Sequence, residues 1–226
     1  MASGIQAISF DVGGTLIEPW PSVGDVYAEV ATESGYPCPD PQRITRQFVQ
    51  AWQGRKSFGY TRQDWAEVVE KSFEGVLPSQ VASRLFPLIY DRFTEARSWH
   101  LYPDVLPTLE RLRAQGLRMA ITSNWDERLD ATLRALNLQD YFEVVTASGP
   151  LGYHKPTAAI FHATCEALQL QPKQVLHVGD SRSEDFGGST DAGLQGLLLR
   201  RQHVAALEPH EINSLLGLRT SPTSFR

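Results

Sequence analysis

The chain has 226 residues, of which 42% are hydrophobic and 21% are charged. These proportions are ordinary for a folded globular protein and exclude a disordered chain, a fibrous protein and a small disulfide-stapled scaffold. The formal net charge of −5 provides no overall attraction to nucleic acid or to an anionic membrane surface. We expect a soluble, cytoplasmic protein, because residues 1–10 lack the pattern of a signal peptide and no apolar stretch approaches the ~20 residues of a membrane span.

A short apolar run near the start of the chain is followed by a long helical region. Residues 5–10 (IQAISF) are mostly apolar, which is typical of a strand buried on both faces of a sheet. Residues 18–100 have helical spacing instead, with helix start signals at Asp40, Thr61 and Ser79. We therefore predict that residues 18–100 form a helical cap inserted after the first strand.

Strands and helices alternate along the rest of the chain. Four further apolar runs predict strands at residues 117–122, 144–147, 175–178 and 196–199. Helical patterns precede or separate these runs, and they cover residues 103–116, 127–138 and 158–170, with Asp126 and Thr157 as expected N-caps of the last two. The alternation predicts an α/β fold, a doubly wound, Rossmann-like parallel sheet built from residues 1–17 and 101–226.

Polar residues follow the predicted strands at the end where open α/β sheets bind their ligands. The candidate site residues at this end are Asp11, Gly13, Gly14 and Thr15 after the first strand, Ser123 and Asn124 after the second, Lys155 after the third, and Asp180 and Asp185 after the fourth. Taken singly, each has a structural alternative, such as a helix cap for Asp11 or a solvated surface position for Lys155. Their placement at four successive strand ends favours one shared site.

The side chains expected at this edge of the sheet have complementary chemistry. Converging carboxylates repel one another unless a cation lies among them, and hard oxygen ligands with open positions suit Mg²⁺. A lysine beside them balances charge and holds an anionic group of a substrate. Together these groups indicate a nucleophilic carboxylate that acts on a phosphoryl group or a similar electrophile.

Four motifs, FDVGGTL, ITSN, GYHKP and HVGDSRSEDFGGSTDAG, occur in this order along nearly the whole chain. In this order they resemble the motifs of the haloacid dehalogenase-like (HAD) hydrolase superfamily. Within it, the sequence is most similar to the branch called haloacid dehalogenase-like hydrolase domain-containing protein 3. The resemblance implies a Rossmann-like core with a helical cap inserted after the first motif.

The resemblance also implies a role for each matched position. Asp11 is expected to be the nucleophile, which becomes transiently phosphorylated, while Ser123 and Lys155 stabilise the transferring group. The expected Mg²⁺ ligands are Asp11, Asp180 and the backbone carbonyl of Gly13, with Asp185 orienting the metal or its waters. The residues expected to bind substrate are Gly14, Thr15 and Asn124.

One position departs from the family pattern. Phosphatases of the family carry an aspartate two residues after the nucleophile, as general acid and then base, and this chain has Gly13 there. General acid–base catalysis contributes about 10²–10⁴-fold. We therefore predict a Mg²⁺-dependent phosphatase that is weakened or specialised. Its expected partner is a small phosphorylated metabolite, with no nucleic acid and no membrane, and the expected state is a monomer or a weak homodimer.

Three alternatives fit parts of the pattern. A dehalogenase-type hydrolase, in which Asp11 attacks carbon and halide leaves, needs no acid at position 13. A phosphonate hydrolase needs an imine-forming cap lysine, for which the cap offers only Lys56 and Lys71. A catalytically inactive binding protein with the same fold would explain Gly13, although Asp11, Lys155 and the other motif residues are all present.

Overall fold

A computed structural model describes residues 4–37, 40–55, 58–201 and 206–219. The chain divides into two compact units. Unit 1 comprises Met1–Glu18, Leu101–Trp125 and Asn137–Arg226, and unit 2 comprises Pro19–His100 and Asp126–Leu136. The sequence analysis divided the chain near residues 18 and 100, whereas unit 2 also contains the later segment 126–136.

Unit 1 is built on a six-stranded sheet with the order β5-β4-β1-β6-β7-β8. Every neighbouring pair of strands in it is parallel. The strands are β1 (Ala7–Phe10), β4 (Arg118–Ser123), β5 (Val144–Ala147), β6 (Val175–Gly179), β7 (Gln195–Leu199) and β8 (Glu211–Ile212). The predicted doubly wound α/β sheet is confirmed, and β8 is a sixth strand that the apolar runs did not indicate.

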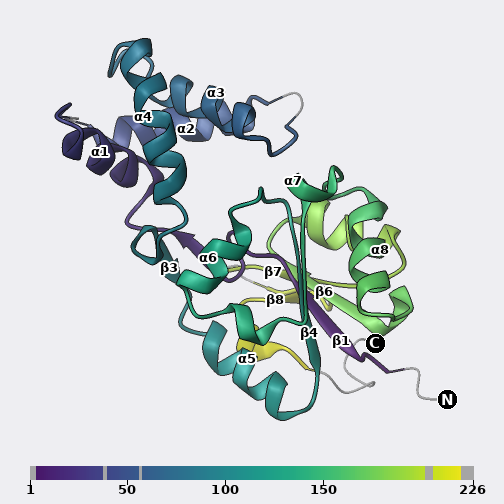
Figure 1. Ribbon diagram of the computed structural model, residues 1–226. Coiled ribbons are helices and arrows are strands. Elements are labelled where there is room, and N and C mark those ends of the chain that lie inside the picture. The colour runs from purple at the N-terminus through teal and green to yellow at the C-terminus, as the bar shows by residue number, and fades with distance from the viewer. Residues whose placement is uncertain (1–3, 38–39, 56–57, 202–205, 220–226) are drawn as a thin grey trace. The chain divides into compact units, whose positions relative to one another are not determined.

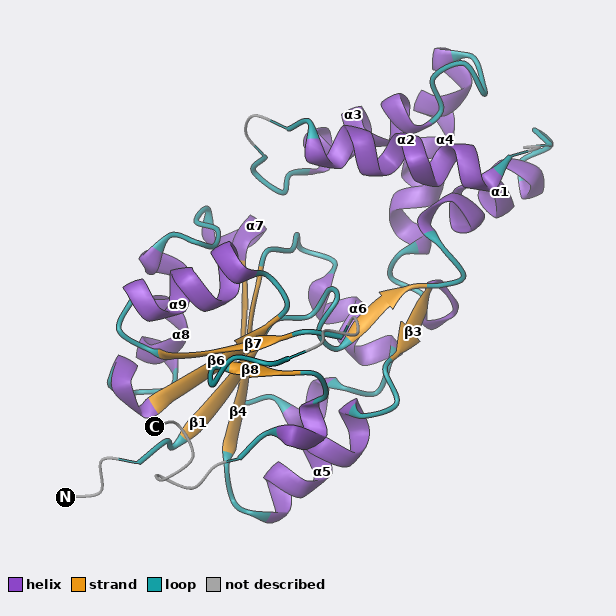
Figure 2. Ribbon diagram, turned by 180° about the vertical axis from the view of Figure 1, so that it is seen from behind, coloured by secondary structure: helices purple, strands orange, loops and turns teal. Residues whose placement is uncertain are grey.

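Helices cover both faces of this sheet, with α8 and α9 on one face and α5 on the other (Figure 2). The helices of unit 1 are α5 (Val105–Ala114), α7 (Ser148–Leu151), α8 (Ala158–Ala167) and α9 (Gly188–Asp191). Short helical turns complete the unit: η2 (Gln139–Tyr141), η3 (Pro172–Gln174), η4 (Arg182–Gly187) and η5 (Leu215–Gly217). Ala7, Ala120, Ile160 and Phe161 are fully buried where α8 packs on the sheet.

The strand order determines which loops meet. β1 lies between β4 and β6, and its last residue, Phe10, pairs with Ile121 of β4 and Val178 of β6. The chain therefore winds outward in both directions from β1, which is the switch point at which open α/β sheets form their ligand sites. The residues that follow β1, β4 and β6 share one edge of the sheet.

Unit 2 is helical (Figure 1). Its helices are α1 (Val23–Glu33), α2 (Pro41–Gln53), α3 (Arg62–Ser72), α4 (Ser79–Arg92) and α6 (Leu129–Ala135), with the turn η1 (Ala96–Ser98). Buried Tyr27, Phe73 and Leu85 lie in the core among α1–α4. None of the described helices is both long enough and apolar enough to cross a bilayer.

Two of the three predicted helix start signals of unit 2, Asp40 and Thr61, cap their helices as predicted, whereas Ser79 does not. The Asp40 carboxylate accepts a hydrogen bond of 2.8 Å from the Arg43 N–H, and Thr61 and Asp64 form a reciprocal capping box. α4 begins at Ser79 itself, with Pro78 at the N-cap. Two short strands, β2 (Ile17–Pro19) and β3 (Trp99–Leu101), pair with each other at the ends of this region, where we expected none.

The predicted N-cap at Asp126 is wrong. α6 begins at Leu129 with Arg128 at its N-cap position. The Asp126 carboxylate is fully buried, and it accepts hydrogen bonds from the Arg128 backbone at 2.9 Å and from the Arg128 guanidinium at 2.8 Å. Leaving a buried carboxylate without a cation costs more free energy than leaving a helix without a side-chain cap, so Asp126 pairs with Arg128.

Candidate active site

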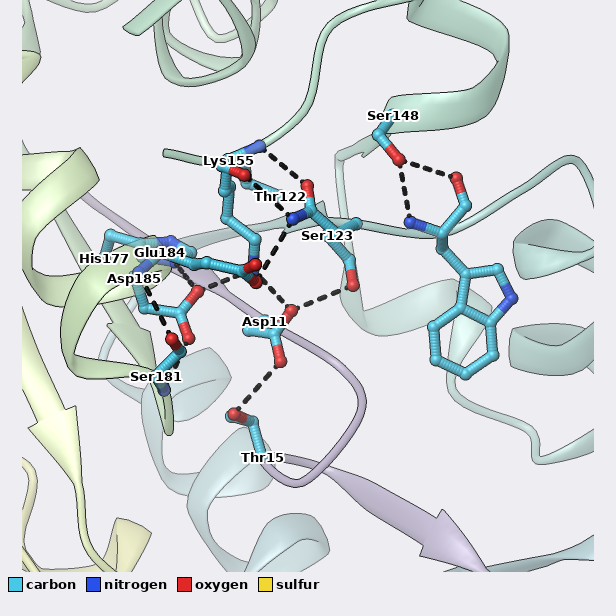
Figure 3. Close-up of polar contacts among 12 residues, drawn as sticks. Asp11, Thr15, Thr122, Ser123, Ser148, Lys155, His177, Ser181, Glu184 and Asp185 are labelled. Carbon is cyan, nitrogen blue, oxygen red and sulfur yellow. Dashed lines mark hydrogen bonds and ion pairs between the residues drawn. The ribbon is translucent and has the colours of Figure 1, made fainter. Parts of the chain in front are cut away.

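The loop after β1 places Asp11 at the centre of a group of buried polar side chains (Figure 3). The Asp11 Oδ1 atom accepts hydrogen bonds from Lys155 Nζ at 2.6 Å and from Ser123 Oγ at 2.9 Å. The Asp11 Oδ2 atom accepts a longer bond of 3.3 Å from Thr15 Oγ1. Three donors therefore fix the orientation of this carboxylate, and they come from the loop after β1, the end of β4 and the segment before α8.

Lys155 connects two of the predicted site carboxylates. Its side chain is 1% exposed, and Nζ lies 2.6 Å from Asp11 Oδ1 and 2.5 Å from Asp185 Oδ1. Burial alone would lower the pKa of Lys155, but the charges of Asp11 and Asp185 outweigh burial and raise that pKa above its ordinary value. The two carboxylate contacts therefore favour the charged ammonium form of Lys155.

Asn124 holds the backbone of Lys155. Its Oδ1 accepts the Lys155 N–H at 2.7 Å, and its Nδ2 donates to the Lys155 carbonyl at 3.1 Å and to Glu184 Oε2 at 3.2 Å. We expected Asn124 to bind substrate. These bonds give it a second task, which is to fix the loop that carries the lysine.

Asp11, Asp180 and Asp185, hereafter the aspartate cluster, have the spacing of a metal site. Each offers a carboxylate oxygen, and these three oxygens lie within 4.8 Å of one another. Partial desolvation, followed by the charges of Asp11 and Asp185, raises the pKa of Asp180 from 3.8 to about 7. With all three carboxylates ionised, the single charge of Lys155, which contacts Asp11 and Asp185, leaves the cluster with a net charge of −2. A divalent cation fits this charge and this set of oxygen ligands.

The third carboxylate, Asp185, accepts hydrogen bonds at both of its oxygens. Its Oδ1 accepts from Lys155 Nζ and from His177 Nε2, which is 3.0 Å away, and its Oδ2 accepts the Ser181 N–H at 2.9 Å. Burial would raise the pKa of Asp185, but the Lys155 charge and the His177 hydrogen bond hold it well below its usual range.

Two neighbouring glycines in the loop after β1 have different constraints. Gly14 has φ +77°, and a Cβ atom there would lie 2.5 Å from Asp180 Oδ2, so only glycine fits. Gly13 is exposed and its φ lies outside the left-handed region. A Cβ atom at Gly13 would meet only Trp125 Cζ3, at an ordinary 3.6 Å. The structure therefore leaves room for a side chain at position 13.

The sequence analysis gave no role to two polar residues of this site, His177 and Glu184. His177 is fully buried in β6 and contacts Asp185, and burial lowers its pKa more than Asp185 raises it. Glu184 accepts from Asn124, and burial raises its pKa. The available signal was a histidine inside an otherwise apolar strand, since a buried imidazole requires polar partners.

Comparison with known proteins identifies the family. A sequence model described as haloacid dehalogenase-like hydrolase matches residues 5–193, so the chain belongs to the haloacid dehalogenase-like hydrolase family. Haloacid dehalogenase-like hydrolase domain-containing protein 3 of Xenopus laevis is 30% identical over 206 residues, covering 86% of this chain and 84% of the relative. The predicted superfamily and branch are confirmed.

Other similar proteins include phosphatases and dehalogenases. Phosphoglycolate phosphatase of Chromobacterium violaceum is 28% identical over 196 residues, covering 84% of this chain and 82% of the relative. The crystal structure of a dehalogenase superposes with a TM-score of 0.72 at 24% sequence identity, covering 96% of both chains. At that identity the likeness concerns the fold. The family and the relatives together make the protein a hydrolase of the haloacid dehalogenase-like type.

Proposed function

We propose that the protein is a Mg²⁺-dependent phosphatase of small phosphorylated metabolites with Asp11 as its nucleophile. The observation that carries this proposal is the charge imbalance of the aspartate cluster, in which one buried ammonium group contacts two of three clustered carboxylates. A site that needs a divalent cation and already contains a lysine suits a dianionic phosphoryl group. The similarity to phosphoglycolate phosphatase supports the same reaction class.

Asp11 and the side chains around it have different roles in the proposed reaction. Asp11 attacks phosphorus, the bond to the leaving oxygen breaks, and water then hydrolyses the aspartyl phosphate. Lys155 and Ser123 hold the Asp11 Oδ1 atom, so the nucleophile is oriented before substrate arrives. Asp11, Asp180 and the Gly13 carbonyl would hold Mg²⁺, with Asp185 orienting the ion or its waters, and the ion would supply positive charge against the phosphoryl oxygens.

Gly13 determines which leaving groups the site accepts. Glycine has no proton to donate to a leaving oxygen and no base to activate water, so both chemical steps lose general acid–base help. A weakly basic leaving group, such as that of an aryl or acyl phosphate, needs little protonation. We therefore propose a preference for such esters over alkyl phosphates.

A panel of phosphate esters with and without Mg²⁺ tests the proposal. We expect Mg²⁺-dependent release of phosphate, faster for aryl than for alkyl esters, and complete loss of release in Asp11→Asn. Release that persists in Asp11→Asn, or that is unchanged when Mg²⁺ is removed, contradicts the proposal.

Restoring an acid at position 13 sharpens the test. Because Gly13 has permissive φ and open space at Cβ, Gly13→Asp is expected to fold and to speed alkyl phosphate hydrolysis by about 10- to 1,000-fold. Gly13→Asn has nearly the same shape but no acid, so it serves as the control and should show no gain. Equal rates for both variants would mean that a missing acid is not what limits turnover.

A dehalogenase-type activity is the second candidate, because Gly13 is no obstacle to it. Halide leaves without a proton, and Asp11 would attack carbon rather than phosphorus. Halide release from 2-haloacids, measured without Mg²⁺, tests this candidate. Such release, with no turnover of any phosphate ester, would replace the phosphatase proposal.

A further inference from the structure

His177 is a fully buried histidine in the middle of β6, behind the aspartate cluster. Its Nε2 lies 3.0 Å from Asp185 Oδ1, and its Nδ1 lies 3.2 Å from Ser9 Oγ on β1. Figure 3 shows the His177 ring beside Asp185, on the side away from Asp11. The imidazole therefore connects a site carboxylate to the interior of the sheet.

The Asp185 side chain sits in a cradle made by several parts of the chain. A Cβ atom at Gly179 would lie 2.2 Å from Asp185 Cγ, so the carboxylate rests against the bare backbone at the end of β6. Lys155 and His177 donate to Oδ1, and the Ser181 N–H donates to Oδ2. The imidazole is the one donor in this set that comes from the strand itself, which is the most rigid support available.

Hydroxyl groups behind the imidazole fix its tautomer. A carboxylate only accepts hydrogen bonds, so in a neutral imidazole Nε2 must carry the hydrogen and Nδ1 must accept from Ser9. Ser9 Oγ lies 2.6 Å from Thr122 Oγ1, which lies 2.7 Å from Thr164 Oγ1. This buried row of hydroxyls crosses from β1 to β4 and reaches α8. Ser9 can therefore donate to the imidazole while its oxygen accepts a hydrogen bond from Thr122.

We propose that His177, oriented by Ser9, is the positioning residue of Asp185. It fixes the carboxylate that orients the metal site and that also holds the far side of the Lys155 ammonium group. His177 touches neither substrate nor metal, and it acts through Asp185. The inference deepens the proposed function and rests on it, because Asp185 matters only if the aspartate cluster holds a cation.

Two substitutions at His177 separate positioning from packing. His177→Leu keeps bulk but removes the donor, and we expect Mg²⁺ affinity to fall about 10- to 100-fold, as is typical when a partner of a metal ligand is lost. His177→Gln retains an N–H donor of similar reach and should recover most of that affinity. The expected kinetic effect of His177→Leu is a lower kcat with little change in substrate KM.

A matched control lies at the far end of the same hydroxyl row. Thr146 Oγ1 lies 2.9 Å from Thr164 Oγ1, and Thr146 is also buried but lies three hydroxyls away from the imidazole. Thr146→Val perturbs the same interior and is expected to leave Mg²⁺ affinity unchanged. Ser9→Ala should weaken Mg²⁺ binding in the same direction as His177→Leu, by a smaller factor.

Calorimetric Mg²⁺ titrations and ¹⁵N NMR of the imidazole decide the proposal. Native Mg²⁺ affinity in His177→Leu, or no recovery in His177→Gln while both variants melt cooperatively, overturns it. If His177→Leu does not fold, the comparison of native protein, His177→Gln and Ser9→Ala stands in its place. If the native protein binds no Mg²⁺, the proposed function fails separately. The NMR spectrum still tests the positioning, because hydrogen on Nδ1 rather than Nε2 contradicts it.

Discussion

Two groups of acidic side chains in unit 1 have the spacing of a metal site, and they differ in charge balance. The aspartate cluster has three carboxylates, and the single ammonium group of Lys155 contacts two of them, Asp11 and Asp185. The second group, hereafter the glutamate cluster, consists of Glu208, His210 and Glu211. Its two carboxylates face two guanidinium groups, since Arg182 contacts both glutamates and Arg200 contacts Glu211.

The difference shows that spacing alone does not make a metal site. Among the described residues, the glutamate cluster is already neutralised by arginines, so a cation would have to displace them. In the aspartate cluster, Lys155 contacts only Asp11 and Asp185, and desolvation followed by the charges of these two carboxylates raises the pKa of Asp180 to about 7. Function is therefore expected at the unbalanced cluster, and structural support at the balanced one.

The largest expected effect follows from removing the shared cation of the aspartate cluster. Lys155→Met leaves the buried carboxylates Asp11 and Asp185 without their shared cation, and breaking such a buried pair costs about 3–5 kcal/mol. Arg182→Ala at the glutamate cluster should cost under about 1 kcal/mol, because the Arg182 side chain is 52% exposed and Arg200 remains. Urea unfolding of both variants checks this, and equal losses contradict the comparison.

A second prediction concerns Mg²⁺ itself. Asp180→Asn removes one unit of the uncompensated charge and is expected to weaken Mg²⁺ binding by at least about tenfold. Glu211→Gln removes a carboxylate from the glutamate cluster and should leave Mg²⁺ affinity unchanged. Calorimetric titration of the two variants provides the test, and a weaker affinity in Glu211→Gln would mean that the wrong cluster was chosen.

A smaller effect is expected in the pH dependence of stability without metal. The pKa of Asp180 is raised from 3.8 to about 7 in the folded chain. Between these values the folded state holds a proton that the unfolded chain has released, so the free energy of unfolding falls as pH rises from about 4 to about 7. Asp180→Asn lacks this loss, and its Tm should exceed the native Tm at about pH 8 but match it at about pH 4.

Adding Mg²⁺ provides the control for that prediction. The native protein should gain Tm at about pH 8 because a ligand that binds only the folded state stabilises it, whereas Asp180→Asn should gain little. If the two proteins have the same Tm at both pH values with and without Mg²⁺, then Asp180 is not the carboxylate whose pKa is raised in the folded site.

Much of unit 1 follows from the sequence because its strands are buried on both faces. Such strands read as continuous apolar runs, and a polar residue directly after each run marks the active edge of the sheet, as Asp11 and Asp180 do. β8 could not be found in this way, since Glu211–Ile212 is too short to show any period. The short strands β2 and β3 could not be predicted from the sequence for the same reason.

Other features depended on contacts between residues far apart in the chain. The additional role of Asn124, which is to hold the Lys155 backbone, depends on hydrogen bonds that link residues 31 positions apart. The role of His177 depends on Ser9, which is 168 positions away. Asp126 reads as a helix cap in the sequence, and only the folded chain shows that its carboxylate is buried against Arg128.

The central claim is that Asp11 forms a covalent phosphoryl intermediate. Because Gly13 offers no base to activate water, hydrolysis of this intermediate is expected to be slow, so it should accumulate with a substrate whose leaving group departs easily. The direct measurement is mass spectrometry of the acid-quenched protein after mixing with 4-nitrophenyl phosphate and Mg²⁺. The account predicts a phosphoryl group on the peptide that contains Asp11, and none in Asp11→Asn. Release of 4-nitrophenol by the native protein with Asp11 unmodified at every time point would contradict it.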